Sequence, residues 1–202
     1  MPTTIARPAP LDPRTTPELP PERLALLDVL PPLAKGNHAV RPDGTADGYC
    51  VNEMIAFLAG EPHGDTPACA SPVAYTFAMS WNDALPTDAD RDRLLRPLIP
   101  HLYGTRTTAA DEEVRAWMAT DWLARVQTPA WLRLAGLTAE ARAIKGCARI
   151  VDATTAGVAQ LALNAARDAA RDALAPTVAA LQDSAATLLR AMCDVGRVRP
   201  AE

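Results

Sequence analysis

The sequence has few aromatic residues, almost no lysine and no long apolar run. Aromatic residues make up 4% of the 202 positions and apolar residues 49%, so a core must be built mainly from Ala, Leu, Val and Ile. No stretch approaches the roughly 20 apolar residues that span a bilayer, and the N-terminus lacks the apolar centre of a secretion signal. We therefore expect a cytoplasmic protein, or one exported without a cleavable signal.

Several classes of partner and chemistry have no basis in the sequence. The formal net charge is −4 and the isoelectric point is about 5.4. Nucleic acids and anionic membranes bind basic surfaces, so we expect neither as a partner. Four cysteines are too few for a disulfide framework in a chain of this length. There is also no Cys-x-x-Cys pair, no phosphate-binding glycine loop and no recognisable oxyanion-stabilising motif.

Composition divides the chain into three parts. Residues 1–20 contain six prolines and few large apolar side chains, which is typical of a flexible arm. Residues 21–150 carry the apolar periodicity of a helical domain, and residues 151–202 form an alanine-rich helical arm. We see no period-two alternation typical of strands. We therefore predict an all-α protein: an irregular helical bundle with a disordered Pro-rich N-terminus and a long C-terminal helical hairpin or arm.

Capping residues locate the expected helices of the central part. Thr87 and Thr138 are typical N-caps, Thr108 and Asp111 have the spacing of a capping box, and Gly60 is placed to end a helix. Apolar side chains recur at helical spacing between these positions. The expected helices cover residues 20–30, 49–59, 72–85, 89–99, 109–127, 129–137 and 139–146.

The C-terminal part has a different pattern. Residues 154–175 are rich in alanine with repeated Arg-Asp pairs, and Pro176 interrupts them. Beyond this, apolar side chains alternate by four and three, which is a coiled-coil-like pattern. A helical hairpin, a helix packed along the domain or a dimer seam would each explain it. The heptad-like seam consists of Leu174, Val178, Leu181, Ala185, Leu188, Met192 and Val195.

Residues 48–72 are the part of the chain whose residue types suggest chemistry. A helix beginning near Cys50 runs into a loop that carries His63 and Cys69. If the chain folds back after the helix, these three side chains meet at one place. Two thiolates and an imidazole favour zinc over magnesium or calcium. The pattern therefore suggests a zinc site with Cys50, His63 and Cys69 as ligands.

Neighbouring acidic residues would complete such a site. Glu53 lies one helical turn after Cys50, and Asp65 is placed to orient His63. Either carboxylate, or Cys147, is a candidate fourth ligand. Three alternatives stay open. The cysteines are small buried side chains while His63 and Asp65 tie the loop together; Cys50 and Cys69 form a disulfide, which the compartment disfavours; or Glu53, His63, Asp65 and Cys69 belong to a metal-dependent or thiol enzyme.

Several short motifs resemble a known group of proteins. They are CVNEM, LAGEPHGDTPAC, SPV, SWNDALP, LIPHLYGT and WLARVQTPAWLRLAGL. The stretch from Cys50 to Thr105 is similar to a family of uncharacterised bacterial proteins, found mostly in actinobacteria and sometimes near phage-like genes. Related sequences often have histidine at the position of Thr66, and the resemblance implies no particular activity.

We expect a non-enzymatic interaction or assembly protein of a phage-related or accessory kind. It would bind a protein partner or a second copy of itself through the helix of residues 174–195. The loop of residues 48–72 would then be a structural feature that binds zinc or no cofactor at all. The alternative is the small enzyme built on Glu53, His63, Asp65 and Cys69.

Overall fold

The computed structural model describes residues 5–40 and 46–194, and after residue 173 it describes few side chains. The chain separates into two compact units, Met1–Ala116 and Trp117–Glu202, which we describe separately. The sequence analysis placed a division near residue 150 because the composition changes there. The change in contacts falls earlier, inside a single helix that carries both Ala116 and Trp117.

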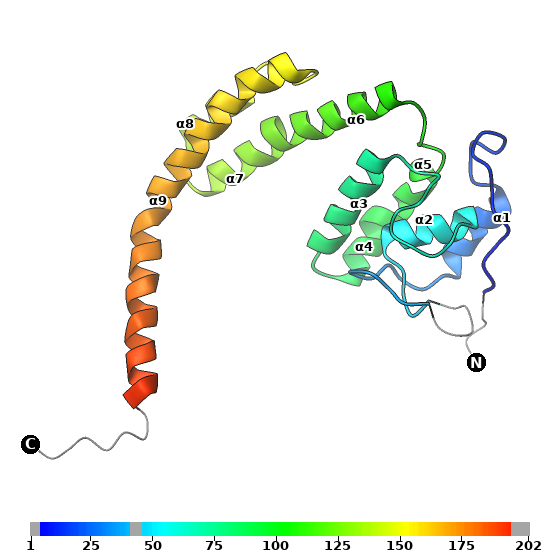
Figure 1. The fold of residues 1–202 in the computed structure, drawn as a ribbon, viewed down its shortest axis with the longest axis horizontal. Helices are drawn as coiled ribbons and strands as arrows, with labels where there is room; N and C mark the ends of the chain where they lie inside the picture. The colour runs from blue at the N-terminus through cyan, green and yellow to red at the C-terminus, as the bar shows by residue number, and fades with distance from the viewer. Residues whose placement is uncertain (1–4, 41–45, 195–202) are drawn as a thin grey trace, which may run out of the picture. The chain divides into compact units, whose positions relative to one another are not determined.

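The predicted all-α fold is confirmed (Figure 1). In the described ranges, extended pairing is limited to isolated bridges between Leu33 and Tyr49 and between Val40 and Ala46. None of the helices in these ranges is long and apolar enough to cross a membrane. The α-helices are α1 Pro21–Leu24, α2 Val51–Ala59, α3 Pro72–Ala84, α4 Asp88–Leu95, α5 Ile99–Leu102, α6 Ala109–Trp122, α7 Thr128–Leu134, α8 Thr138–Lys145 and α9 Ala153–Asp194. Short 3-10 turns lie at η1 Ala25–Asp28 and η2 Arg96–Leu98, and a π-helical turn lies at η3 Leu123–Gln127.

Helix α2 is the centre of the first unit (Figure 1). All nine of its residues are buried, and the helices around it contribute large apolar side chains such as Leu95 and Ile99 to the same core. Cys50 caps its N-terminus, and Gly60 ends it in the left-handed conformation with φ of 73°. Glycine adopts this conformation without the steric cost that a Cβ atom imposes. The predicted position of this helix is therefore confirmed to within two residues.

The N-terminal segment is extended, as its proline content predicts, but it has specific contacts. Leu19 is buried in the core, and Leu11 packs against it. The Leu11 amide also donates a hydrogen bond of 2.8 Å to the Ala59 carbonyl at the end of α2. Proline restricts the unfolded chain, so fixing such a segment costs less entropy than fixing an average one. Residues 5–20 therefore cover the end of α2.

The local cap signals mostly correspond to real helix ends. Thr87 caps α4, and the Thr108 hydroxyl accepts from the Asp111 amide at 3.2 Å. Ser71, which the sequence analysis did not identify, caps α3. Thr138 is instead the first residue of α8 and makes no capping bond. The expected break before residue 129 is also absent, because η3 connects α6 to α7 directly.

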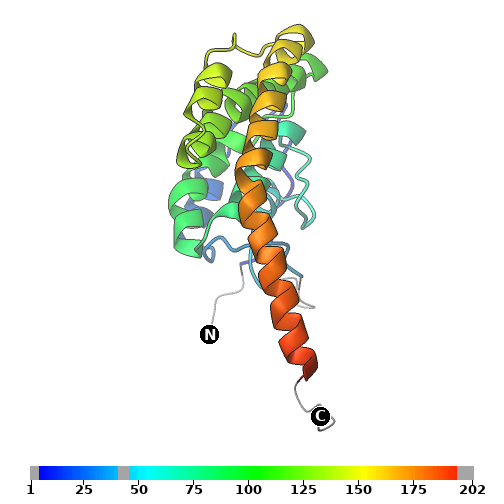
Figure 2. The ribbon, with the colours of Figure 1, turned by 90° about the vertical axis from the view of Figure 1, so that its left-hand side faces the viewer.

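The second unit is built on a hairpin of α7 and α8 against the first half of α9. One small buried cluster contains Leu132, Ile144 and Ala166, and another contains Ile150 and Ala159. Helix α9 is a single helix of 42 residues with Pro176 inside it, so residues 153–194 form the predicted arm and not a hairpin. Figure 2 shows this helix as one long rod.

Candidate functional site

Glu53, on the first turn of α2, is a buried carboxylate that collects several hydrogen-bond donors. Its side chain is 2% exposed. One oxygen accepts from the Cys50 amide at 2.7 Å, and the other accepts from the His38 amide at 2.8 Å. The Cys50 sulfur in turn accepts from the Glu53 amide, which makes a capping box with cysteine in place of the usual serine or threonine.

Two of the three histidines converge on this carboxylate. The His38 Nδ1 atom lies 2.7 Å from one Glu53 oxygen, and the His63 Nε2 atom lies 3.4 Å from the other. The same His63 nitrogen is 2.8 Å from the His38 carbonyl, so it donates there. Glu53 therefore joins the loop before α2 to the loop after it. We call Glu53, His38 and His63 the histidine–glutamate cluster.

The electrostatics of the cluster favour an ionised carboxylate. Burial raises the pKa of Glu53, but hydrogen bonds from the Cys50 and His38 amides and from the His38 imidazole outweigh it, and the net pKa is lowered. A buried carboxylate with several donors is stable in its charged form because each donor replaces a lost contact with water. The ionised Glu53 side chain therefore links the loop before α2 to the loop after it in the core of the first unit.

The two cysteines of the predicted zinc site have different surroundings. Cys50 caps α2 beside Glu53, whereas the Cys69 thiol lies beside the Glu61 carboxylate and the Gly104 backbone. Burial raises the pKa of Cys50 to about 12 and also raises the pKa of Cys69 well above its ordinary value. Because the thiolate is the form that binds metals and attacks substrates, both residues behave as buried thiols at neutral pH.

Asp65 and Cys147, the other predicted metal ligands, also have separate surroundings. The Asp65 carbonyl accepts a hydrogen bond from the Asn52 side chain, and Cys147 belongs to the second unit, where its thiol donates to the Ala143 carbonyl. Across residues 5–40 and 46–194, no group of three or more His, Cys, Asp or Glu side chains is arranged to hold a metal ion. The zinc site at Cys50, His63 and Cys69 thus gains no support and stays a prediction.

His38 is the member of the cluster that the sequence analysis did not identify. It precedes α2 by more than ten residues, and Gly48 leaves room for its ring, since a Cβ atom at Gly48 would lie 2.5 Å from it. Neither the position of His38 before α2 nor the presence of Gly48 forms a motif that a reader of the sequence would recognise. A carboxylate that orients an imidazole is also the geometry of a general base.

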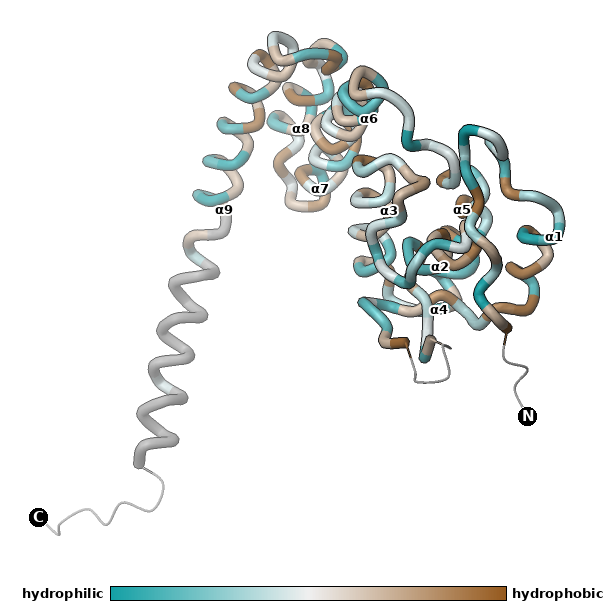
Figure 3. Tube along the Cα trace, turned by 45° about the vertical axis from the view of Figure 1, so that its right-hand side comes forward, coloured by the Kyte–Doolittle hydropathy of each residue, from teal (hydrophilic) through white to brown (hydrophobic). Residues whose placement is uncertain are grey.

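The second unit has an unusually apolar exterior. Its two buried clusters are small, while many large apolar side chains of its helices are exposed. Trp131 is 66% exposed and Leu134 is 81% exposed. Figure 3 shows hydrophobic positions distributed along these helices. Among the described side chains of the unit, the exposed large apolar ones are Met118, Trp122, Leu123, Val126, Trp131, Leu134, Val151, Val158 and Leu161.

Helix α9 is much longer than the helices beside it in its own unit. At 1.5 Å per residue, its 42 residues extend over about 63 Å, whereas α8 has eight residues and α7 has seven. The buried Ala159 and Ala166 and the half-buried Leu163 lie on the stripe that faces the hairpin. With helical steps of three and four, this stripe leads through Ala170 into the predicted seam at Leu174. The side chains of the seam itself lie outside the described residues.

Comparison with known proteins adds no functional assignment. No protein-family model matches the chain, and neither does any curated protein or solved structure. The resemblance to the actinobacterial family stays a prediction.

Proposed function

We propose that the protein is a non-enzymatic interaction protein that associates with a second copy of itself through the C-terminal half of α9. The observation that carries this proposal is the length of α9, whose 42 residues extend far beyond the eight of α8. The sequence predicts the apolar seam over residues 174–195 of this helix. An accessory role in an assembly is consistent with it.

Helix stability supports association. An isolated helix in water is marginal, and most helical stability in proteins comes from packing an apolar face. Pro176 adds to the need for packing, because proline inside a helix removes one backbone hydrogen bond and costs about 3 kcal/mol. The seam residues repeat at alternating steps of four and three, which is the spacing that two helices bury against each other.

A second copy is the partner that matches the seam best. It offers a helix of the same length, the same apolar spacing and the same stripe, as a two-fold symmetric interface requires. A large apolar area with few charges is typical of permanent homodimers.

An enzyme based on Glu53, His63, Asp65 and Cys69 is the weaker proposal. Cys69 lies beside Glu61, and its raised pKa disfavours the reactive thiolate. The histidine–glutamate cluster is satisfied internally by its own hydrogen bonds. We observe no feature that favours the enzyme over the interaction protein.

Sedimentation equilibrium or light scattering after gel filtration tests the proposal with matched variants. We expect the wild-type chain to be a dimer at micromolar concentration. Leu188→Glu removes one apolar side chain of the seam from each copy, and burial of a leucine contributes about 1.5–3 kcal/mol. The dimer dissociation constant should therefore rise at least about a hundredfold.

Ala186→Glu is the control, since it adds the same charge to the same helix away from the seam. It should leave the dimer intact. A wild-type chain that is monomeric up to about 100 µM, where a stable homodimer would be saturated, contradicts the proposal. Equal effects of the two substitutions would also contradict it, because they would locate the interface elsewhere.

A further inference from the structure

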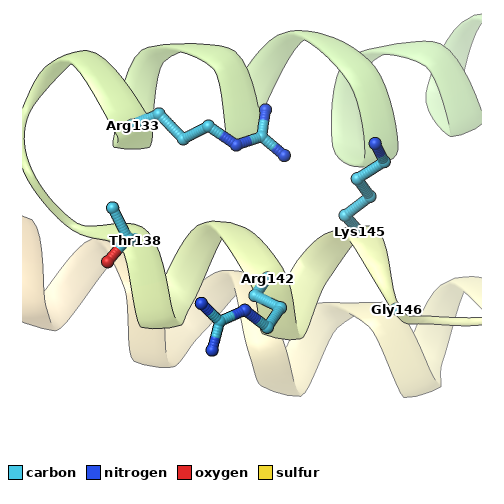
Figure 4. Close-up of a pocket in the computed structure, with 5 residues that line it drawn as sticks. All are labelled: Arg133, Thr138, Arg142, Lys145 and Gly146. Atoms are coloured by element: carbon cyan, nitrogen blue, oxygen red, sulfur yellow. The ribbon is translucent and has the colours of Figure 1, made fainter.

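A basic cavity lies in the second unit between α7 and α8. Its volume is about 430 Å³, and it is lined by Arg133, Thr138, Arg142, Lys145 and Gly146. Figure 4 shows Arg133 and Lys145 extending into the same space from the two helices, with Arg142 on the adjoining turn of α8. This volume falls in the range of small-molecule sites, about 300–1,000 Å³.

The positive charges of this cavity have no carboxylate partner among the described side chains. Most described arginines do have one. Examples are Arg91 with Asp88, Arg96 with Asp92 and Arg125 with Asp121. The cavity thus concentrates three positive charges in a chain whose net charge is −4.

Each of these cations lies in the last turn of its helix, where the helix dipole favours a positive charge. Arg142 and Lys145 are also three residues apart on one helix, and like charges at this spacing repel by a few tenths of a kcal/mol. A bound anion would reverse the sign of this interaction, since each cation then gains a charge-assisted hydrogen bond.

We infer that the cavity binds a small molecule that carries a diphosphate group. A diphosphate has the charge to balance three cations and the length to contact residues from two helices. The guanidinium of Arg133 has the planar fork that matches two phosphate oxygens, and the Lys145 ammonium acts as a point charge. This inference concerns a region separate from the proposed α9 seam.

Isothermal titration calorimetry with inorganic pyrophosphate tests the inference on the full-length protein. We expect saturable binding with a dissociation constant below about 1 mM at 0.15 M salt, and weaker binding of orthophosphate. Arg142→Gln and Lys145→Gln should each reduce the affinity about tenfold or more, since each removes a charge-assisted hydrogen bond. Arg133→Lys keeps the charge but removes the fork, and its affinity should lie between that of the wild type and that of Arg133→Gln.

Arg167→Gln is the control variant. It removes one positive charge from the same unit, at an exposed residue whose guanidinium lies 3.5 Å from Asp168, and its affinity should stay within about twofold of the wild type because long-range charge is screened by salt. Far-UV circular dichroism of each variant verifies that the helices are retained. Absence of pyrophosphate binding by the folded wild-type protein would overturn the inference. So would an equal loss of affinity in Arg167→Gln and Lys145→Gln, or equally tight binding of citrate.

Discussion

Replacing Glu53 with glutamine should destabilise the first unit by breaking the histidine–glutamate cluster. The substitution keeps the size of the side chain but exchanges one acceptor oxygen for an NH₂ donor. The carboxylate accepts from the backbone amides of Cys50 and His38 on different oxygens. Whichever way the new amide is turned, its donor group faces one of these N–H groups. At least one buried donor therefore loses its acceptor.

The expected loss follows from the contacts. An unsatisfied buried donor costs about 1–3 kcal/mol, and a hydrogen bond to a charged group contributes about 1.5–3 kcal/mol. These contributions overlap, so we expect a total of about 2–4 kcal/mol for Glu53→Gln. With a urea slope of about 1–3 kcal/mol per molar, the unfolding midpoint should move down by about 0.7–4 M.

The pH dependence provides a second readout. The folded pKa of Glu53 lies below its ordinary value of 4.5, so the unfolded chain takes up a proton first as the pH falls. The contribution of the carboxylate is therefore present in full above pH 4.5 and is lost as the pH falls through the folded pKa. The difference in stability between wild type and Glu53→Gln should shrink below pH 4.5.

Hydrogen–deuterium exchange is suited to this measurement because it separates the two units. Amides of α2 report on the first unit, where exchange of a buried helix follows the free energy of unfolding. Glu22→Gln, at an exposed position of α1, is the control and should exchange as the wild type does. If the α2 amides exchange equally slowly in Glu53→Gln and Glu22→Gln, the Glu53 carboxylate does not stabilise the first unit as we describe.

Further predictions concern the buried thiols and the N-terminal segment. In the native protein, iodoacetamide at pH 7.5 should label Cys50 and Cys69 at least about a hundredfold more slowly than after unfolding, because both are buried with raised pKa values. Peptide mass spectrometry measures this, and rapid native labelling of either residue would contradict the assigned surroundings. Gly60→Ala should cost about 1–2 kcal/mol from its left-handed conformation and should also expose residues 5–12 to proteolysis, since the new Cβ would lie 2.3 Å from the Ala9 carbonyl oxygen. Gly64→Ala, where no atom lies within 4 Å, should do neither.

Local features of the fold were predictable because neighbouring residues encode them. Gly60 ends α2 through its own backbone freedom, and Thr108 and Asp111 cap α6 through side chains three residues apart. Such signals need no knowledge of the remaining chain. Pro176 is the instructive exception. Proline normally interrupts a helix, yet α9 continues through it, because helix on both sides can offset one missing hydrogen bond.

Contacts between distant segments were not predictable in the same way. His38 contacts Glu53 from a loop that contains no recognisable motif. Leu11 contacts Ala59 across about fifty residues of sequence. Both contacts depend on how the chain closes around α2. The cations of the basic cavity were visible in the sequence, but their convergence requires α7 and α8 to form a hairpin. Arginine is so common in this chain that its position alone carries no signal.

The π-helical turn Leu123–Gln127 contains one residue more than an α-helix would need over the same span. Deleting a single residue there would therefore restore a regular helix and keep Trp131 and Leu134 on the same side of the rod. A deletion in a regular part of the helix would instead turn everything after it by about 100° around the axis. The π-helical turn is thus the place where this rod can change its length by one residue without redirecting the apolar side chains that follow.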